Sequence, residues 1–255
     1  LAMHLIRLYL LPLFALALFT ATFYPAFSQL AGKWSVSDDY THAFFTAPII
    51  IYMVWQKRGQ LVESRGNLLA GSVLCAFSLF FYVLSLQIQV PTIIFFATAC
   101  TIISIVVLFS GFRALALLVV PLLLLLMIIP IPNQLFSMAT AALQLKVSAA
   151  SEMIINLLGV PIFREGNVLH APGKTFQVVE ACSGIRSLIS MTTLSLIIGH
   201  FTLERARAIG LLFLSSIPIA LLINVVRVVA LVAVYHYLDM DLSVGTPHTV
   251  FGVLL

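Results

Sequence analysis

Cys182 stands in the sequence "EACSGIRS", where the neighbouring residue types favour thiol chemistry. A cysteine is a good nucleophile only as its thiolate, and both a helix N-terminus and a nearby guanidinium stabilise that anion. Ser183 and Gly184 suit a tight helix start, and Arg186 follows one helical turn after the cysteine on the same face. Glu180 can be solvated, or it can orient and pair with Arg186. The segment predicts a cysteine presented at an electropositive helix start.

Two residues far away in the sequence extend this candidate site. Arg227 ends "NVVR", which begins at Asn224, and His248 begins "HTVFG". Histidine can take a proton from a thiol and return one to a leaving amine near neutral pH. Arginine does not give up its proton, so it is suited to hold a carboxylate or a developing oxyanion. We expect Cys182, Arg227 and His248 to be catalytic, with Asn224 in support.

Each of these residues also has a purely structural interpretation. A free cysteine is often a small buried hydrophobe, which is how we interpret Cys75 and Cys100 within their apolar runs. Arg186 and Arg227 can snorkel to lipid headgroups, and His248 can form a hydrogen bond within a loop. No His/Cys cluster has metal-ligand spacing, and no glycine-rich phosphate loop is present, so we expect no metal and no organic cofactor.

The composition predicts an integral membrane protein. Of the 255 residues, 62% are hydrophobic and 9% are charged, and the mean hydropathy is +1.14. Soluble domains carry about a quarter charged residues. We interpret the formal net charge of +4 as a topology signal, so the expected partner is the lipid bilayer and no nucleic acid.

Apolar runs of about the length of a membrane-spanning helix, roughly 20 residues, recur along the chain. They lie near 6–30, 42–56, 67–88, 91–111, 112–130, 184–203 and 207–223. Lipid leaves an isolated segment no other way to satisfy its backbone, so all are predicted helices. The first run exceeds the apolar stretch of about 7–15 residues in a secretory signal, so we interpret it as a retained span.

Lysine and arginine gather in alternate loops. Loops 56–67 and 203–207 are basic, whereas loops 32–42 and 86–91 are acidic or neutral. The positive-inside bias therefore predicts a cytoplasmic N-terminus, with the chain emerging on the outer side at 130–134. The start of the cysteine-bearing helix is then extracytoplasmic.

Two segments between the spans have their own character. Residues 135–158 look helical but carry Gln144, Lys146 and Glu152 near the middle, so we expect a helix at the outer interface. Residues 160–181 contain short β-prone runs separated by turn-forming clusters, which predicts a small hairpin or a three-stranded element.

The run 208–238 is too long for one span. As a single helix it would extend about 46 Å, beyond a hydrocarbon core of about 30 Å. We expect it to break, bend or protrude, with Pro218 and Asn224 marking the place and 228–238 forming a reentrant or surface helix. The chain ends at "VLL", where we expect a further span to begin.

These features together predict the fold class. We expect an all-α polytopic membrane protein with about seven to eight transmembrane helices. An extracytoplasmic interfacial helix and a small β-hairpin should precede the cysteine-bearing helix. We expect residues 1–255 to form a single membrane-embedded domain.

The motifs "EACSGIRS", "NVVR" and "HTVFG" resemble those of the exosortase/archaeosortase family of membrane-embedded transpeptidases. In that family's bacterial branch, the Cys of A-C-S-G, the Arg of N-x-x-R and the His of H-x-x-x-G form the proposed active site. The sequence "DDYTHAFF" looks like the family's early D-Y-S-H-G-F segment, and "PIPNQL" resembles its proline-bearing motif. This likeness adds His42 to the candidates for substrate binding, although Thr41 and Ala43 depart from the family's Ser and Gly.

The resemblance implies cleavage of a C-terminal sorting signal, of the PEP-CTERM type, on exported proteins at a bacterial inner membrane. Cys182 would form a thioester acyl-enzyme, and the product would pass to an acceptor. Two other functions fit the residues. One is an intramembrane cysteine protease that uses water; the other is a non-catalytic transport or lipid-binding protein in which Arg186 and Arg227 hold an anionic headgroup. Against a transporter, no inverted repeat or pair of broken helices is evident.

Overall fold

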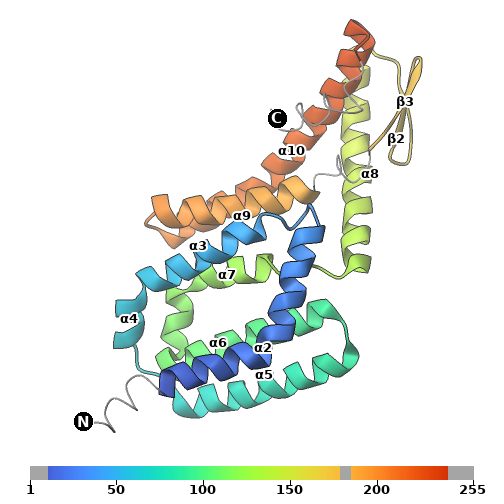
Figure 1. Cartoon of the computed structure of the whole chain (residues 1–255). Coiled ribbons are helices and arrows are strands. Elements are labelled where there is room, and N and C mark those ends of the chain that lie inside the picture. Colours follow the sequence, from blue (N-terminus) through green and yellow to red (C-terminus); the bar gives the residue numbers. More distant parts are fainter. Residues whose placement is uncertain (1–10, 179–184, 241–255) are drawn as a thin grey trace. The chain divides into compact units, whose positions relative to one another are not determined.

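The structure, a computed structural model, describes residues 11–178 and 185–240 (Figure 1). The chain divides into two compact units, Leu1–Pro130 and Ile131–Leu255. Helices dominate both units, and the second also holds a small antiparallel sheet. The predicted helical membrane architecture is confirmed, and each unit is described by itself below.

The first unit contains a run of consecutive helices. They are α2 (Leu11–Val36), α3 (Ala43–Gln56), α4 (Arg58–Glu63), α5 (Leu68–Ile88), α6 (Pro91–Leu117) and α7 (Val119–Met127). Two buried clusters hold them together, one around Trp34 and Phe95 and one around Phe23 and Tyr82. The Trp34 indole donates a hydrogen bond of 2.9 Å to the Ile128 carbonyl, so α2 is tied to the end of α7.

Helices α5 and α6 pack closely as a helical hairpin, and both their ends and their interface favour this packing. The Asn67 side chain caps α5 by accepting a hydrogen bond from the Ala70 amide, and Pro91 opens α6 at its first turn. A Cβ at Gly71 would collide with the Leu108 backbone, so the two helices approach more closely than a larger residue would allow. Gly71 is therefore a packing requirement.

Helix α6 has a kink at Gly111, which adopts φ +72°. The sequence predicted separate runs 91–111 and 112–130, and the kink lies at their boundary. The second run is divided, however, between the end of α6 and the nine residues of α7. Nine residues extend about 13 Å, so α7 does not cross a hydrocarbon core of about 30 Å by itself.

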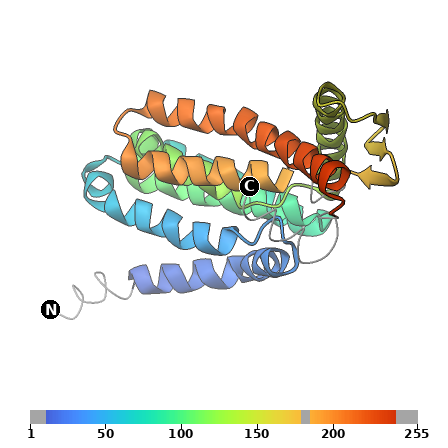
Figure 2. The same ribbon diagram turned by 90° about the horizontal axis from the view of Figure 1, so that it is seen from above.

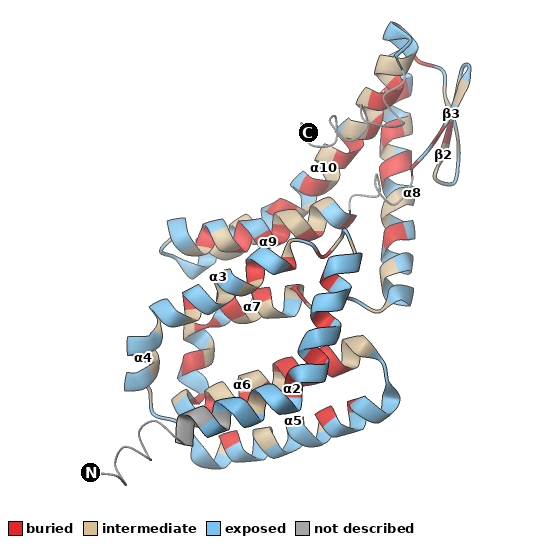
Figure 3. Ribbon diagram, in the orientation of Figure 1, coloured by how far each residue is buried: buried red, intermediate tan, exposed pale blue. Residues whose placement is uncertain are grey.

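The second unit contains three helices and the sheet among its described residues. They are α8 (Asn133–Leu157), β1 (Phe163–Glu165), β2 (Val168–Ala171), β3 (Lys174–Gln177), α9 (Ile185–Thr202) and α10 (Ala206–Leu238). The strands are antiparallel in the order β1-β2-β3, which confirms the predicted β element. Gly166 and Gly173, at φ +63° and +81°, form the two tight turns. Burial follows the inner faces of these elements (Figure 3).

Helix α10 runs continuously over 33 residues, so of the expected break, bend or protrusion, a break at Pro218 and Asn224 does not occur, and residues 228–238 belong to the same helix. Its second half has its own buried face, on which Val225, Val228 and Val232 pack in the core shared with α8 and the sheet. That packing stabilises the helix beyond Pro218. Its contribution outweighs the loss of the single backbone hydrogen bond that proline removes.

Three helices in the described part of the chain are long and apolar enough to cross a membrane. They are α5, α6 and α10. Much of their apolar surface is exposed; Leu69 and Phe77 of α5, for example, are 80% and 69% exposed. Such surface is stable against lipid, which is as apolar as the side chains themselves. The larger number of about seven to eight spans stays a prediction.

Candidate active site

The predicted site residues divide into two groups. Those that lie outside the described residues are Glu180, Cys182, Ser183, Gly184 and His248. Those that the structure describes are His42, Arg186, Asn224 and Arg227. The last three belong to the second unit, and His42 belongs to the first.

Helices α9 and α10 form an antiparallel pair joined by a short connection at 203–205, and they lie side by side in both views (Figures 1 and 2). Their register is fixed at Gly199, where a Cβ would stand 3.2 Å from the Ile209 Cγ2 atom. Both helices rise by about 1.5 Å per residue. Ile185, the first residue of α9, is therefore level with about Ile223 of α10.

This register brings the start of α9 to the level of the predicted arginine motif. Asn224 is next to Ile223 and is 1% exposed. Arg227 follows Asn224 by about one turn, is half-buried, and has a buried Nε atom. A half-buried guanidinium interacts more strongly with an anion than one in water, because the surrounding dielectric is lower. Arg227 is thus suited to bind an anion near the start of α9.

The described chain before the cysteine motif ends at a residue that packs against the same part of α10. Val178, four residues before the cysteine, is 2% exposed and belongs to one buried cluster with Val225 and Val228. These two valines flank Arg227 in the sequence. Of the two described ends around the cysteine, Val178 therefore packs on α10 beside the Asn224–Arg227 turn, and Ile185 is level with that turn.

Arg186 lies in the first turn of α9 and is exposed. A cation at a helix N-terminus opposes the helix dipole, so its position is not explained by helix stability. It adds positive potential at the end of α9 that is level with Arg227.

His42 immediately precedes α3, and its Nε2 atom is buried without a hydrogen-bond partner among the described residues. Burial lowers the pKa of His42, because desolvation disfavours the imidazolium; a hydrogen bond with the Asp39 backbone acts in the opposite direction. The ring also stacks on Tyr40. The role of His42 in substrate binding stays a prediction.

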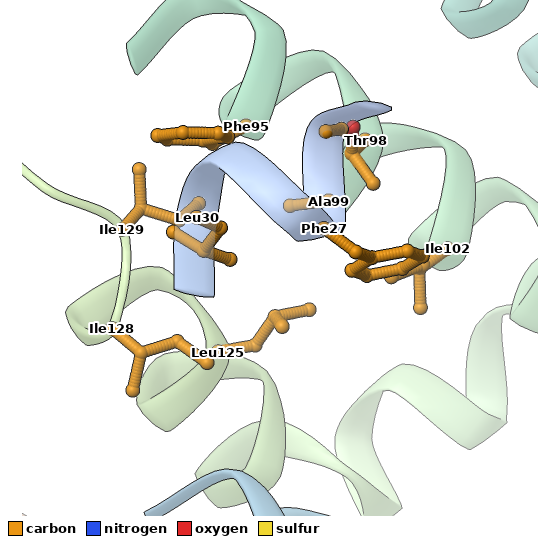
Figure 4. Close-up of a pocket in the computed structure, with 10 residues that line it drawn as sticks. Phe27, Leu30, Phe95, Thr98, Ala99, Ile102, Leu125, Ile128 and Ile129 are labelled. Carbon is orange, nitrogen blue, oxygen red and sulfur yellow. The ribbon is translucent and has the colours of Figure 1, made fainter. Parts of the chain in front are cut away.

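Three apolar cavities lie among the described residues of the first unit. One, of about 410 Å³, lies between α5 and α6, with Cys100 and Ser104 in its wall. The other two lie beside α2. The larger of these two, of about 530 Å³, is lined by α2, α3, α6 and α7. The smaller, of about 30 Å³, lies between α2, α6 and the end of α7, with Phe27, Leu30 and Ile102 among its lining residues (Figure 4). The Thr98 hydroxyl in its wall is already bonded to the Ile94 carbonyl. Neither of these two cavities offers groups for catalysis. Residues 11–178 and 185–240 also contain no group of three His, Cys, Asp or Glu side chains placed to hold a metal ion.

The sequence analysis noted polar residues on α8 but missed that they form a stripe that binds the hairpin. Gln144, Ser148 and Glu152 are spaced by four residues, and they bond Asn167, Gly166 and Arg164 of the β1–β2 hairpin. Regular i, i+4 spacing of polar residues on an otherwise apolar helix was the available signal. The stripe holds the sheet, and with it the chain that leads to Cys182, on α8.

The fold and the described residues define a polytopic membrane protein in which an arginine-bearing helix packs beside the start of a second helix preceded by a cysteine motif. The chain belongs to the transmembrane exosortase (Exosortase_EpsH) family, which matches residues 34–255. Members of that family are known as membrane cysteine transpeptidases that process sorting signals. No curated protein and no solved structure shows a significant match to the chain.

Proposed function

We propose that this protein is a cysteine transpeptidase that cleaves a PEP-CTERM type C-terminal sorting signal from exported proteins and transfers the product to an acceptor. Family membership supports the reaction class. The single structural observation in favour is that Val178, shortly before Cys182, is packed with Val225 and Val228, which flank Arg227. This packing supports the proposal that a thiol and a guanidinium from distant segments act together in the second unit.

The reaction proceeds in two steps. The Cys182 thiolate attacks the scissile carbonyl and forms a tetrahedral oxyanion, which Arg227 stabilises. The C–N bond then breaks to give a thioester, and His248 donates a proton to the departing amine. A nucleophile from the acceptor attacks the thioester, forms the new acyl bond and releases the thiolate. Arg186, Asn224, Glu180, His42 and the backbone near Ser183 and Gly184 contribute to substrate binding or oxyanion support.

The site faces the extracytoplasmic side of a bacterial inner membrane. The basic loops support this orientation, because the positive-inside bias places them in the cytoplasm. The exposed apolar surface of α5 supports lipid contact, and a substrate's own hydrophobic tail can approach laterally through the same lipid. We expect a membrane-impermeant thiol reagent to label Cys182 in intact cells of a Cys75→Ala, Cys100→Ala variant. Labelling only after permeabilisation would indicate the opposite orientation, with Cys182 on the cytoplasmic side.

The decisive experiment compares three cysteine variants. A reporter with a PEP-CTERM type C-terminal signal is expressed with the enzyme in membranes, and its cleavage is followed by electrophoresis and intact mass. Cys182→Ala should abolish cleavage, whereas the matched variants Cys75→Ala and Cys100→Ala should cleave as the wild type does. Normal cleavage by Cys182→Ala would reject the proposal. A product ending in a free carboxylate, with no adduct, would indicate hydrolysis in place of transfer.

A further inference from the structure

Asn167 holds the chain at the point where it leaves the sheet toward the cysteine motif. The Val178 amide donates to the Asn167 carbonyl at 2.9 Å, and the Asn167 Nδ2 donates to the Val178 carbonyl at 3.1 Å. One residue therefore satisfies both backbone polar groups of Val178. This contact continues the β2–β3 ladder one step beyond its last pair, Val168 and Gln177.

The turn itself does not require this use of the side chain. Gly166 supplies the positive φ of the two-residue β1–β2 turn, and the neighbouring position accepts several small polar residues. The Asn167 amide points instead to Val178 and to Gln144 of α8, whose Oε1 accepts a hydrogen bond of 3.3 Å. Asn167 thus connects α8 and the end of β3.

Val178 is the last residue described before the cysteine motif, and its side chain is buried with Val225 and Val228. The direction of the chain at Val178 is consequently set twice, by packing against α10 and by the two hydrogen bonds that Val178 shares with Asn167, one donated by each residue. Few degrees of freedom remain in the chain at that point. An error there propagates to the residues that follow, and catalysis is sensitive to displacements of about 1 Å.

We propose that Asn167 is a positioning residue for the nucleophile: its side-chain hydrogen bond to the Val178 carbonyl, beside the bond that the Val178 amide donates to the Asn167 carbonyl, fixes the point from which the chain leaves the sheet toward the cysteine motif. This inference rests on the proposed function of Cys182. Asn167, a turn residue of the β1–β2 hairpin, would then affect the reaction rate without contacting the substrate.

The test uses two variants of the full-length protein in membranes. Asn167→Ala removes the side-chain amide, and Asn167→Asp keeps the shape and the turn preference but loses the N–H donor. Asn156→Ala is the matched control. It removes the hydrogen bond that the Asn156 side chain, near the end of α8, accepts from the amide of Ile162, which directly precedes β1. A variant that affects only sheet stability should behave like this control.

For both Asn167 variants we expect kcat to fall about tenfold with KM unchanged, the effect of losing one or two hydrogen bonds at a positioned group. In a Cys75→Ala, Cys100→Ala background, the pH midpoint for alkylation of Cys182 by a maleimide should also rise, because the thiolate loses its cationic neighbour. Asn156→Ala should change neither quantity. If Asn167→Ala lowers the amount of folded protein, Asn167→Asp carries the test.

Two results would overturn the inference. One is wild-type kcat and an unchanged alkylation midpoint in Asn167→Asp, while Cys182→Ala in the same membranes is inactive. The other is an equal loss in Asn156→Ala, which would assign the effect to sheet stability. Cleavage by Cys182→Ala at the normal rate is a different result, because it rejects the proposed function itself.

Discussion

Arg164 and Glu152 form an ion pair between β1 and α8, with the Arg164 Nε atom 2.9 Å from the Glu152 Oε2 atom. Arg164 also donates a hydrogen bond of 2.9 Å to the Gly166 carbonyl, so its side chain links α8 to both β1 and the β1–β2 turn. The two side chains are 30% and 28% exposed. Together with Ser148 and Gln144, the pair makes the α8–sheet layer a polar interface beside an apolar core.

Breaking this pair should destabilise the second unit modestly. We expect a double-mutant cycle of Glu152→Gln and Arg164→Met to give a coupling free energy of about 0.5–1 kcal/mol, because partly exposed ion pairs contribute little beyond that. The measurement is thermal unfolding in detergent micelles. The more exposed pair of Glu165 and His170, 3.7 Å apart, is the control and should give a coupling near zero. Equal coupling for both pairs would contradict the structural assignment.

Two glycines should respond in opposite directions to the same substitution. Gly111→Ala places a Cβ 2.5 Å from the Arg65 carbonyl oxygen at φ +72°, so it should lower the unfolding free energy by more than about 1 kcal/mol. Gly210→Ala lies in α10 with open space around its Cβ, and it should be neutral or stabilising by up to about 1 kcal/mol. Thermal unfolding midpoints compare the two. A stabilised Gly111→Ala would show that the α6 kink is not required.

Local patterns in the sequence predicted most helices and the sheet, because hydrophobic length and turn residues are local properties. The expected run 67–88 appears as Leu68–Ile88, and 184–203 appears as Ile185–Thr202. The absence of a break in α10 has a different origin. Pro218 and the polar Asn224 argue locally for a break, but the valine face beyond them packs against α8 and the sheet, and this tertiary contact is not visible in a short window.

The candidate site was predictable only in part. The motif carrying Arg227 could be found from residue types, and the short α9–α10 connection fixes its level beside Ile185. The proposed role of Asn167 could not be found, because its partner Val178 is bonded through backbone atoms, which any residue type supplies. Whether Cys182 and His248 meet Arg227 stays a prediction.

His42 should make the protein less stable in acid. Its pKa in the folded protein is lowered from 6.5, so the unfolded chain binds the proton more readily and stability falls as the pH drops through this range. His42→Phe removes the titrating group and should reduce the loss in thermal midpoint between about pH 7.5 and pH 5. His170→Phe, on the exposed side of β2, should leave that loss as in the wild type. An unchanged pH dependence in His42→Phe would contradict the buried neutral imidazole.

Arg227 should be required as a planar guanidinium, beyond its positive charge. Removing one preorganised oxyanion donor costs about 10²–10³ in kcat, so Arg227→Ala should lose at least that factor. Arg227→Lys keeps the charge but not the rigid fork of N–H donors, and it should recover less than a tenth of the wild-type rate. Arg186→Ala is the matched control on α9.

Arg186 is exposed whereas Arg227 is half-buried, so Arg186→Ala should lower the cleavage rate less than Arg227→Ala does. Because salt screens exposed charges, the difference in rate between Arg186→Ala and the wild type should become smaller when the salt concentration is raised. The readout is single-turnover cleavage of the reporter in membranes, with thermal unfolding to confirm the fold. Full activity in Arg227→Lys would mean that the site needs only a positive potential. A larger loss in Arg186→Ala would transfer the oxyanion role from α10 to the first turn of α9.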